Sequence, residues 1–378
     1  MRRATDAERA KLHATFAELC AIESPSGHER PCAERIAAEL RTLGLEVEED
    51  RGYAESDAGN LLTRIPGRDA ESILLCAHMD TVPPLAPIEP VLTDGGWVNA
   101  NDGILGADNK AAVAVILTLG RRLLQGGERP PVGLEMLFTV SEENGLHGAK
   151  AFDVSRLRSS FGYVMDHASP IGEIVVASPT YQRIDADIRG RAAHAGIRPE
   201  EGRSAILAAS RAIAAMQLGR LDADTTANIG VIRGGTATNV VPERCEIEAE
   251  VRGIDDTRVE QVVTEMIDHL QDGANATECD LDVMVQVMFK GYRTKGRPRE
   301  LAVAERALEK CGYVPRPITT GGGSDANAFR ASGFPCANLA NGTERNHQPD
   351  ERVSADALEG MFEVAIALLE TAGSEGEA

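Results

Sequence analysis

The spacing of apolar residues over the first 180 positions predicts alternating helices and short strands. Apolar residues recur three and four positions apart over 7–22 and 29–43, which is the period of an amphipathic helix. The Ala- and Val-rich stretch 107–124 predicts a buried helix, and short apolar runs between these segments predict strands. The predicted strands are 61–65, 72–77, 133–140 and 163–165. This alternation predicts an α/β fold built on a largely parallel sheet.

A different pattern begins near residue 180. Single alternation of polar and apolar residues predicts strands, and two amphipathic stretches, 204–218 and 257–271, predict helices. The strands of this region are 182–191, 227–234, 245–252 and 280–289. The order β-α-β-β-α-β is that of a ferredoxin-like α+β domain. Since the first pattern resumes at about 301, we expect an inserted domain, 180–291, within a discontinuous domain of residues 1–179 and 292–378.

Ionisable residues collect where the predicted strands end. His78 and Asp80 follow one strand, the pair Glu142 and Glu143 another, and Asp166 a third. In open α/β sheets, ligands bind at the carboxyl ends of the strands. Carboxylates placed directly after buried strands are costly to bury unless they are paired or bind a metal. We therefore expect these groups to form one site.

Two further residues complete this candidate site. Asp108 opens the long helix, and His347 lies far downstream in the segment Asn-His-Gln-Pro-Asp-Glu. Two imidazoles and several carboxylates, without cysteine ligands, suit zinc, cobalt or manganese. A calcium site conflicts with the histidines, because calcium takes oxygen ligands. Residues two apart on an extended segment face the same way, so we expect the Asp80 carboxylate to accept the far ring N–H of His78.

The residues around these positions resemble the M20 metallopeptidase family, and within it the peptidase T-like, tripeptidase-like branch. The matching segments run in family order over nearly the whole chain. They are AHMDTV (77–82), LGADNKAAVA (105–114), TVSEENGLHGAK (139–150), VMDH (164–167), RAAHAG (191–196), GGTATNVVPE (234–243), GGGSDANAF (321–329) and NHQPDE (346–351). The resemblance implies a zinc-peptidase-like catalytic domain in which the ferredoxin-like insertion is a lid.

The resemblance also implies two divalent metal ions per subunit, zinc with cobalt or manganese as alternatives. Asp108 would bridge the two ions. His78 and Asp166 would complete one metal site, and Glu143 and His347 the other. The remaining two residues would have catalytic roles, with Glu142 as the general base and Asp80 as the partner that orients His78.

Within the lid, the resemblance implies contacts to substrate. His194 and Asn239 would approach the substrate carbonyl or oxyanion, and Arg252 would bind its terminal carboxylate. The segment GGGSDA, which contains Gly323, would offer backbone N–H groups. In many relatives these lid groups reach the neighbouring subunit, so a homodimer formed through the lid is expected.

Composition excludes several classes of partner. The formal net charge of −20 argues against binding to nucleic acid or to an anionic membrane surface, either of which requires a basic face. No apolar run approaches the roughly 20 residues that span a bilayer, and the N-terminal stretch has no apolar region typical of a signal peptide. The seven cysteines lack the spacing of a zinc finger or a disulfide framework. These features predict a cytoplasmic protein.

The expected function is hydrolysis of amide bonds in small peptides by a metal-bridging hydroxide, as in a tripeptide aminopeptidase. Another M20 chemistry, N-acyl amino acid deacylation or carboxypeptidase action, shares the metal site and stays open. A non-catalytic binding protein that retained the fold is a further alternative. Loss of a ligand or of Glu142 would favour that last reading, and neither residue type is lost here.

Overall fold

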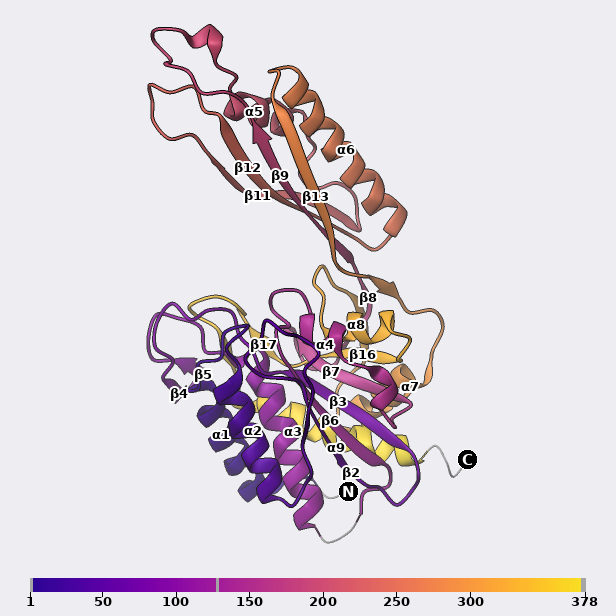
Figure 1. Ribbon diagram of the computed structural model, residues 1–378. Helices are drawn as coiled ribbons and strands as arrows, with labels where there is room; N and C mark the ends of the chain where they lie inside the picture. The colour runs from indigo at the N-terminus through magenta and orange to yellow at the C-terminus, as the bar shows by residue number, and fades with distance from the viewer. Residues whose placement is uncertain (1–2, 127–128, 375–378) are drawn as a thin grey trace. The chain divides into compact units, whose positions relative to one another are not determined.

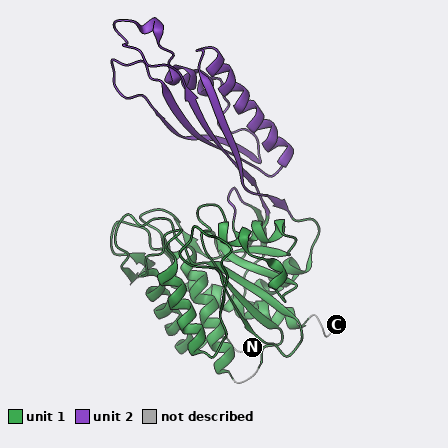
Figure 2. Ribbon diagram, viewed as in Figure 1, with its two compact units in different colours: residues 1–176, 294–319, 324–378 green, residues 177–293, 320–323 purple. Residues whose placement is uncertain are grey.

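The computed structural model describes residues 3–126 and 129–374, and these form two compact units (Figure 2). The first unit comprises residues 1–176, 294–319 and 324–378, of which 1–2, 127–128 and 375–378 lie outside the described residues. The second comprises 177–293 and 320–323. The expected insertion, 180–291, lies inside this second unit, to which the structure adds the short segment 320–323.

The first unit is built on a mixed sheet of order β1-β2-β6-β3-β7-β16-β8-β14, in which β15 also pairs with β8 (Figure 1). The central strands β6, β3, β7 and β16 are parallel, whereas β1, β2, β8 and β14 pair antiparallel at the two sides. The expectation of a largely parallel sheet therefore holds only for its centre. The strands are β1 (Glu48–Glu49), β2 (Leu61–Ile65), β3 (Ser72–His78), β6 (Gly133–Thr139), β7 (Phe161–His167), β8 (Glu173–Ser178), β14 (Tyr292–Arg293), β15 (Arg316–Thr319) and β16 (Cys336–Ala340).

Helices pack against this sheet and against one another around one apolar core. The long helix α3 is buried on nearly every side because it contacts α1, α9 and strand β3. Thr5 and Glu8 form a capping box that begins α1, and the Ser354 side chain caps α9. The helices are α1 (Asp6–Cys20), α2 (Arg30–Thr42), α3 (Ala107–Gln125), α4 (His147–Ala151), α7 (Arg299–Lys310), α8 (Asp325–Ala331) and α9 (Ala355–Gly373), with a 3₁₀ turn at Val154–Arg156.

A second, small sheet in the first unit has no counterpart among the sequence-based expectations. Its order is β17-β18-β5-β4, and all its pairings are antiparallel. The strands are β4 (Pro90–Thr93), β5 (Gly96–Asn99), β17 (Thr343–Glu344) and β18 (Arg352–Val353). This sheet fixes the ends of the segment that carries His347, because β17 precedes that segment and β18 follows it.

The second unit has the ferredoxin-like arrangement expected from its alternating pattern. Its antiparallel sheet has the order β10-β11-β12-β9-β13, and two helices pack on one face around a separate apolar core. Along β9 and β12 every second side chain is buried, as the alternation of polar and apolar residues predicts. The elements are β9 (Thr180–Arg189), α5 (Ala205–Ala215), β10 (Gly219–Arg220), β11 (Thr225–Gly234), β12 (Arg244–Gly253), α6 (Asp256–Asn275) and β13 (Asp280–Phe289), with a 3₁₀ turn at Pro199–Glu201.

Two observations bear on the expected cell compartment. Among the described residues, no helix combines the length and apolar character needed to cross a membrane. The seven cysteines all lie in the described part of the chain and form no disulfide. The cytoplasmic location itself stays a prediction.

Candidate metal centre and active site

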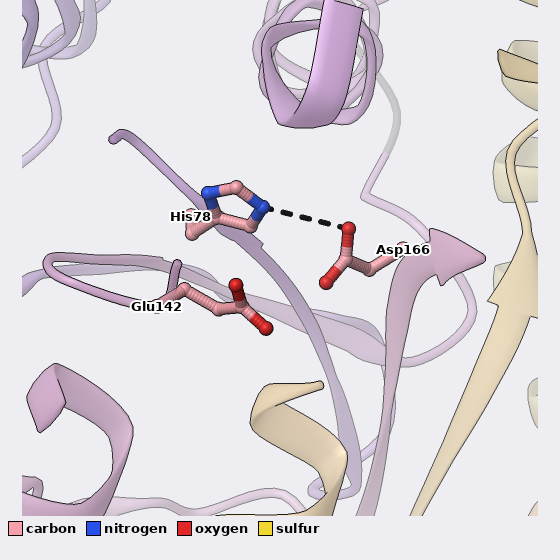
Figure 3. Close-up of side chains that lie close together, drawn as sticks. All are labelled: His78, Glu142 and Asp166. Atoms are coloured by element: carbon pink, nitrogen blue, oxygen red, sulfur yellow. Dashed lines mark ion pairs between the residues drawn. The ribbon is translucent and has the colours of Figure 1, made fainter. Parts of the chain in front are cut away.

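The carboxyl ends of three neighbouring parallel strands bring the first site residues together. His78 is the last residue of β3, Asp166 lies near the end of β7, and Glu142 follows β6. The Nε2 atom of His78 lies 3.5 Å from Oδ1 of Asp166. Figure 3 shows these three side chains extending toward one another from separate segments. Each offers a ligand atom within 4.8 Å of the others, the spacing of a metal site.

The chain bends sharply between β6 and the two glutamates. Ser141 has a positive φ of 52°, which is uncommon outside glycine, and Gly145 has φ 127°. The N–H groups of Gly145 and Leu146 both donate to the Glu142 carbonyl, closing a tight turn. As a result, Glu142 groups with His78 and Asp166, whereas Glu143 groups with His78 and Asp108.

Asp108 lies between the two histidines. Its Oδ1 is 3.3 Å from Nε2 of His78, and its Oδ2 is 3.3 Å from Nε2 of His347. Nε2 of His347 also lies 2.9 Å from Oε2 of Glu143. The backbone of Asp108 is not helical although it stands at the start of α3, and its peptide bond to Asn109 is cis. Through its two oxygens the Asp108 carboxylate thus faces His78 and His347.

Asp80 is placed differently from the expectation. Nδ1 of His78 lies 2.9 Å from the main-chain carbonyl of Asp80 and 3.4 Å from its carboxylate. That main-chain contact requires a proton on Nδ1, and Nε2 faces Asp108 and Asp166. The carboxylate instead accepts the N–H groups of Glu142 and Glu143, at 3.0 and 3.1 Å, and the Ser26 hydroxyl at 2.6 Å. Its main contact is thus with the loop that carries the two glutamates.

The buried carboxylates perturb one another. Burial, together with the charge of Asp166, raises the pKa of Glu142 well above its usual range, and burial with the charge of Asp108 does the same for the pKa of Asp166. Hydrogen bonds to Asp108 and Glu143 raise the pKa of His347 to about 10. Burial opposes protonation of His78, but the neighbouring carboxylates outweigh it and raise its pKa.

These residues fit a pair of divalent cations. Four carboxylates, those of Asp108, Glu142, Glu143 and Asp166, share two imidazoles in a mostly buried space, so the group would carry excess negative charge if all four were ionised. Such a cluster is costly without cations. Its mixed nitrogen and oxygen donors are those of zinc, cobalt and manganese sites.

Three further residues support the site, the buried Glu29 and Glu351 and the half-buried Asn346, and the sequence pattern indicates none of them. Glu351 accepts the backbone N–H of Asp108, and Glu29 accepts the N–H and hydroxyl of Ser141. Asn346 donates its side-chain amide to Oδ2 of Asp108 at 2.8 Å. Asn346 and Glu351 both belong to the segment NHQPDE, in which the sequence pattern indicates only His347 as a site residue. Glu29 carries no signal of this kind.

The four expected substrate residues lie in the second unit. Ala195, next to His194, donates its N–H to the Asn239 carbonyl, so two exposed loops meet there. Nη1 of Arg252 lies 3.4 Å from the Gly321 carbonyl, close in the chain to Gly323. The guanidinium of Arg252 also stacks 4.3 Å from the Tyr181 ring centroid and pairs with Glu250 at 3.1 Å. Their roles toward substrate stay predictions.

Comparison with known proteins identifies the family. Residues 181–278 match the M20 model described as a peptidase dimerisation domain, and residues 60–173 match the model of peptidase family M28. The aminopeptidase PepT of Bacillus cereus is 38% identical over 96% of this chain and 98% of its own, with a TM-score of 0.85. The chain belongs to the M20 peptidase family. It is therefore a peptidase, in the peptidase T-like branch.

Two more relatives extend this assignment over the full length. A tripeptidase from Staphylococcus aureus is 32% identical, covers 97% of this chain and 99% of its own, and has a TM-score of 0.91. The uncharacterized protein YqjE of Bacillus subtilis is 36% identical over 365 residues, which are 96% of this M20 chain and 98% of that protein. Both units of the M20 peptidase are thus shared with these relatives.

Proposed function

We propose that this M20 peptidase is a two-metal aminopeptidase of short peptides, with tripeptides as its main substrates. One observation carries the proposal: the Asp108 carboxylate lies 3.3 Å from both His78 and His347, and Glu142 and Glu143 belong to two different groups of ligand atoms around His78. The preference for tripeptides rests on the similarity to the aminopeptidase PepT and to the tripeptidase.

The proposed metal ligands divide into two sets that share Asp108. His78 and Asp166 would hold one ion, and Glu143 and His347 the other. When bound, two divalent ions lower the pKa of a water molecule and polarise the scissile carbonyl. Zinc is the proposed metal, with cobalt and manganese as alternatives.

Glu142 is the proposed general base. It would take a proton from the attacking water and pass it to the leaving amine. Burial raises its pKa in the metal-free protein, which is the direction that suits a group that takes up a proton and releases it to an amine. Asp80 serves this step by holding the N–H groups of both glutamates.

The second unit is the proposed lid and dimerisation domain. Its match to a peptidase dimerisation domain supports a homodimer formed through this unit. His194 and Asn239 would contact the substrate carbonyl, and Arg252 its terminal carboxylate. Gly323 would present its backbone N–H. In this proposal these groups act on substrate bound in their own subunit or in the neighbouring one. A cytoplasmic location is also proposed.

A peptide panel distinguishes this function from the other M20 chemistries. Metal-loaded protein is offered free tripeptides, dipeptides, N-acyl amino acids, and tripeptides blocked at either end. We expect release of the N-terminal residue from free tripeptides, loss of cleavage after N-terminal blocking, and no hydrolysis after chelation. Turnover confined to N-acyl amino acids, or release of the C-terminal residue, would replace the proposal by deacylase or carboxypeptidase activity.

The role of Glu142 has its own test. Glu142→Gln should keep both metal ions while turnover falls at least about 100-fold, the size of a general-base contribution. Glu309→Gln, on the exposed side of α7, is the matched control and should leave turnover unchanged. Near-normal turnover of Glu142→Gln protein with verified metal content would assign the base to another residue. A loss of metal from this variant would make Glu142 a ligand instead.

A further inference from the structure

The carboxylate of Glu351 is buried and binds the loop that leads into Asp108. Its side chain is 2% exposed. Oε2 accepts the N–H groups of Leu105 and Gly106, both at 2.8 Å, and Oε1 accepts the N–H of Asp108 at 2.9 Å. A buried carboxylate is costly unless its oxygens are hydrogen-bonded, and here both are. The contact therefore has a large effect on the conformation of this loop.

The loop needs such an acceptor because its backbone departs from helical geometry. Gly106 has a φ of 73°, and Asp108 has φ −82° and ψ 105°, although both stand at the start of α3. The first N–H groups of a helix have no intrahelical partner. Glu351 accepts three N–H groups of this stretch, and so it selects the backbone course that directs the Asp108 side chain toward both histidines.

Glu351 also belongs to the segment that carries His347. The N–H of Glu351 donates to the Gln348 carbonyl at 3.0 Å, which folds the residues between them into a turn. Just before His347, the Asn346 side chain donates to Oδ2 of Asp108 at 2.8 Å. The segment thus contacts the Asp108 side chain through Asn346 and His347, and the Asp108 backbone through Glu351. Strand β18, which pairs with β5, fixes the segment directly after Glu351.

We propose that Glu351 is a positioning residue that holds Asp108 and His347 at their mutual distance and thereby sets the affinity of the metal pair. The proposal rests on the proposed two-metal function. Glu351 contacts neither substrate nor metal. It acts through the backbone of Asp108, and its loss changes the spacing of ligands that stand on segments far apart in the chain.

Glu351→Gln tests this proposal with little change in shape. The amide has one oxygen and one NH₂ group, so whichever way it turns, an N–H of the loop faces another donor. We expect both ions to bind about 10- to 100-fold more weakly, the range seen when partners of metal ligands are removed. With cobalt bound, the visible absorption spectrum should change in intensity, because that spectrum reports ligand geometry directly.

Glu135→Gln is a closely matched control. Glu135 is 1% exposed, its Oε2 accepts the N–H groups of Arg158 and Ser159, and its Oε1 accepts Nε of Arg64. It lies near the start of β6, whereas the metal ligands follow the end of that strand. This variant should lose stability and keep wild-type metal affinity and the wild-type cobalt spectrum.

The outcomes separate this inference from the proposed function. If the wild-type protein itself binds no pair of ions, the proposed function fails. If the wild-type protein binds two ions and Glu351→Gln binds them equally tightly with an unchanged spectrum, only the role of Glu351 is overturned. Equal weakening by Glu135→Gln would also overturn it, because the effect would then be general. If Glu351→Gln does not fold, Glu351→Asp decides: its carboxylate is withdrawn by one methylene, so wild-type affinity would contradict the proposal.

Discussion

Asp80→Asn should destabilise the protein and weaken catalysis together. The Asp80 side chain is fully buried, and its two oxygens accept the N–H groups of Glu142 and Glu143 separately. In the asparagine variant one oxygen becomes an NH₂ group. If that group faces Ser26 it can donate to the hydroxyl, but the N–H of Glu143 then meets a donor. In the opposite orientation the NH₂ group faces the N–H of Glu142, which then has no acceptor.

The size of the effect follows from this geometry. Either orientation leaves one buried N–H without an acceptor, at about 1–3 kcal/mol, and replaces a charged acceptor by a neutral one for the other N–H. Relief of repulsion between Asp80 and the neighbouring carboxylates offsets part of this loss. We therefore expect the free energy of unfolding to fall by about 2 kcal/mol. Because the Glu142–Glu143 loop loses its anchor, turnover or metal affinity should fall about 10- to 100-fold.

Urea unfolding of metal-free protein measures the first effect. Trp97 is the single tryptophan and is buried in the first unit, so its fluorescence follows unfolding of the unit that holds Asp80. Ser26→Ala is the control, since it removes only the hydroxyl and keeps both N–H contacts; it should retain turnover within a few-fold. Wild-type stability of Asp80→Asn, or lost stability with full turnover and metal affinity, would refute the reasoning.

Two further predictions concern parts of the chain away from the metal ligands. Gly323→Ala places a Cβ 2.4 Å from the buried ring of Phe289. We therefore expect the free energy of unfolding, measured by urea titration, to fall by about 1–3 kcal/mol. Gly321→Ala, whose Cβ would meet no atom within 4 Å, should stay within about 0.5 kcal/mol, and an equal loss in both variants would contradict the packing argument. The Arg30 hydrogen bond holds the pKa of Glu49 below its ordinary value, as arginines do for several other surface carboxylates. A depressed pKa adds stability above the unfolded value, about 4.3, and this contribution is lost as pH falls through the folded value. Urea midpoints should therefore drop as pH falls below about 4.

The apolar pattern predicts most of the helices and strands, because the spacing of apolar residues within an element follows directly from which of its faces is buried. The predicted strand 61–65 coincides with β2, and the predicted helix 107–124 ends within a residue of α3. Strand direction is not encoded in an apolar run, so the antiparallel flanks of the main sheet could not be predicted. The pair β4 and β5 was missed because buried and exposed residues do not alternate along these short strands.

The chemistry of the site could be predicted only where a side chain stands at the end of a strand. His78, Glu142 and Asp166 have that signature, and the structure brings them together. The roles of Glu29 and Glu351 have no such signature, since each binds backbone N–H groups of a segment 112 or 243 residues away. A backbone donor has no identity in the sequence, so its acceptor cannot be recognised before the fold is known.

Buried carboxylates behind the ligands explain how loops can hold so compact a site. Asp80 and Glu29 accept N–H groups from the loop 141–143, and Glu351 accepts them from the stretch 105–108. Hydrogen bonds to a charged acceptor contribute about 1.5–3 kcal/mol, roughly twice those to a neutral one. A neutral side chain at these positions would leave the loops free to relax away from four mutually repelling carboxylates. The negative charge behind the site therefore serves its geometry, and the same charge would strengthen the binding of the cations in the proposed function.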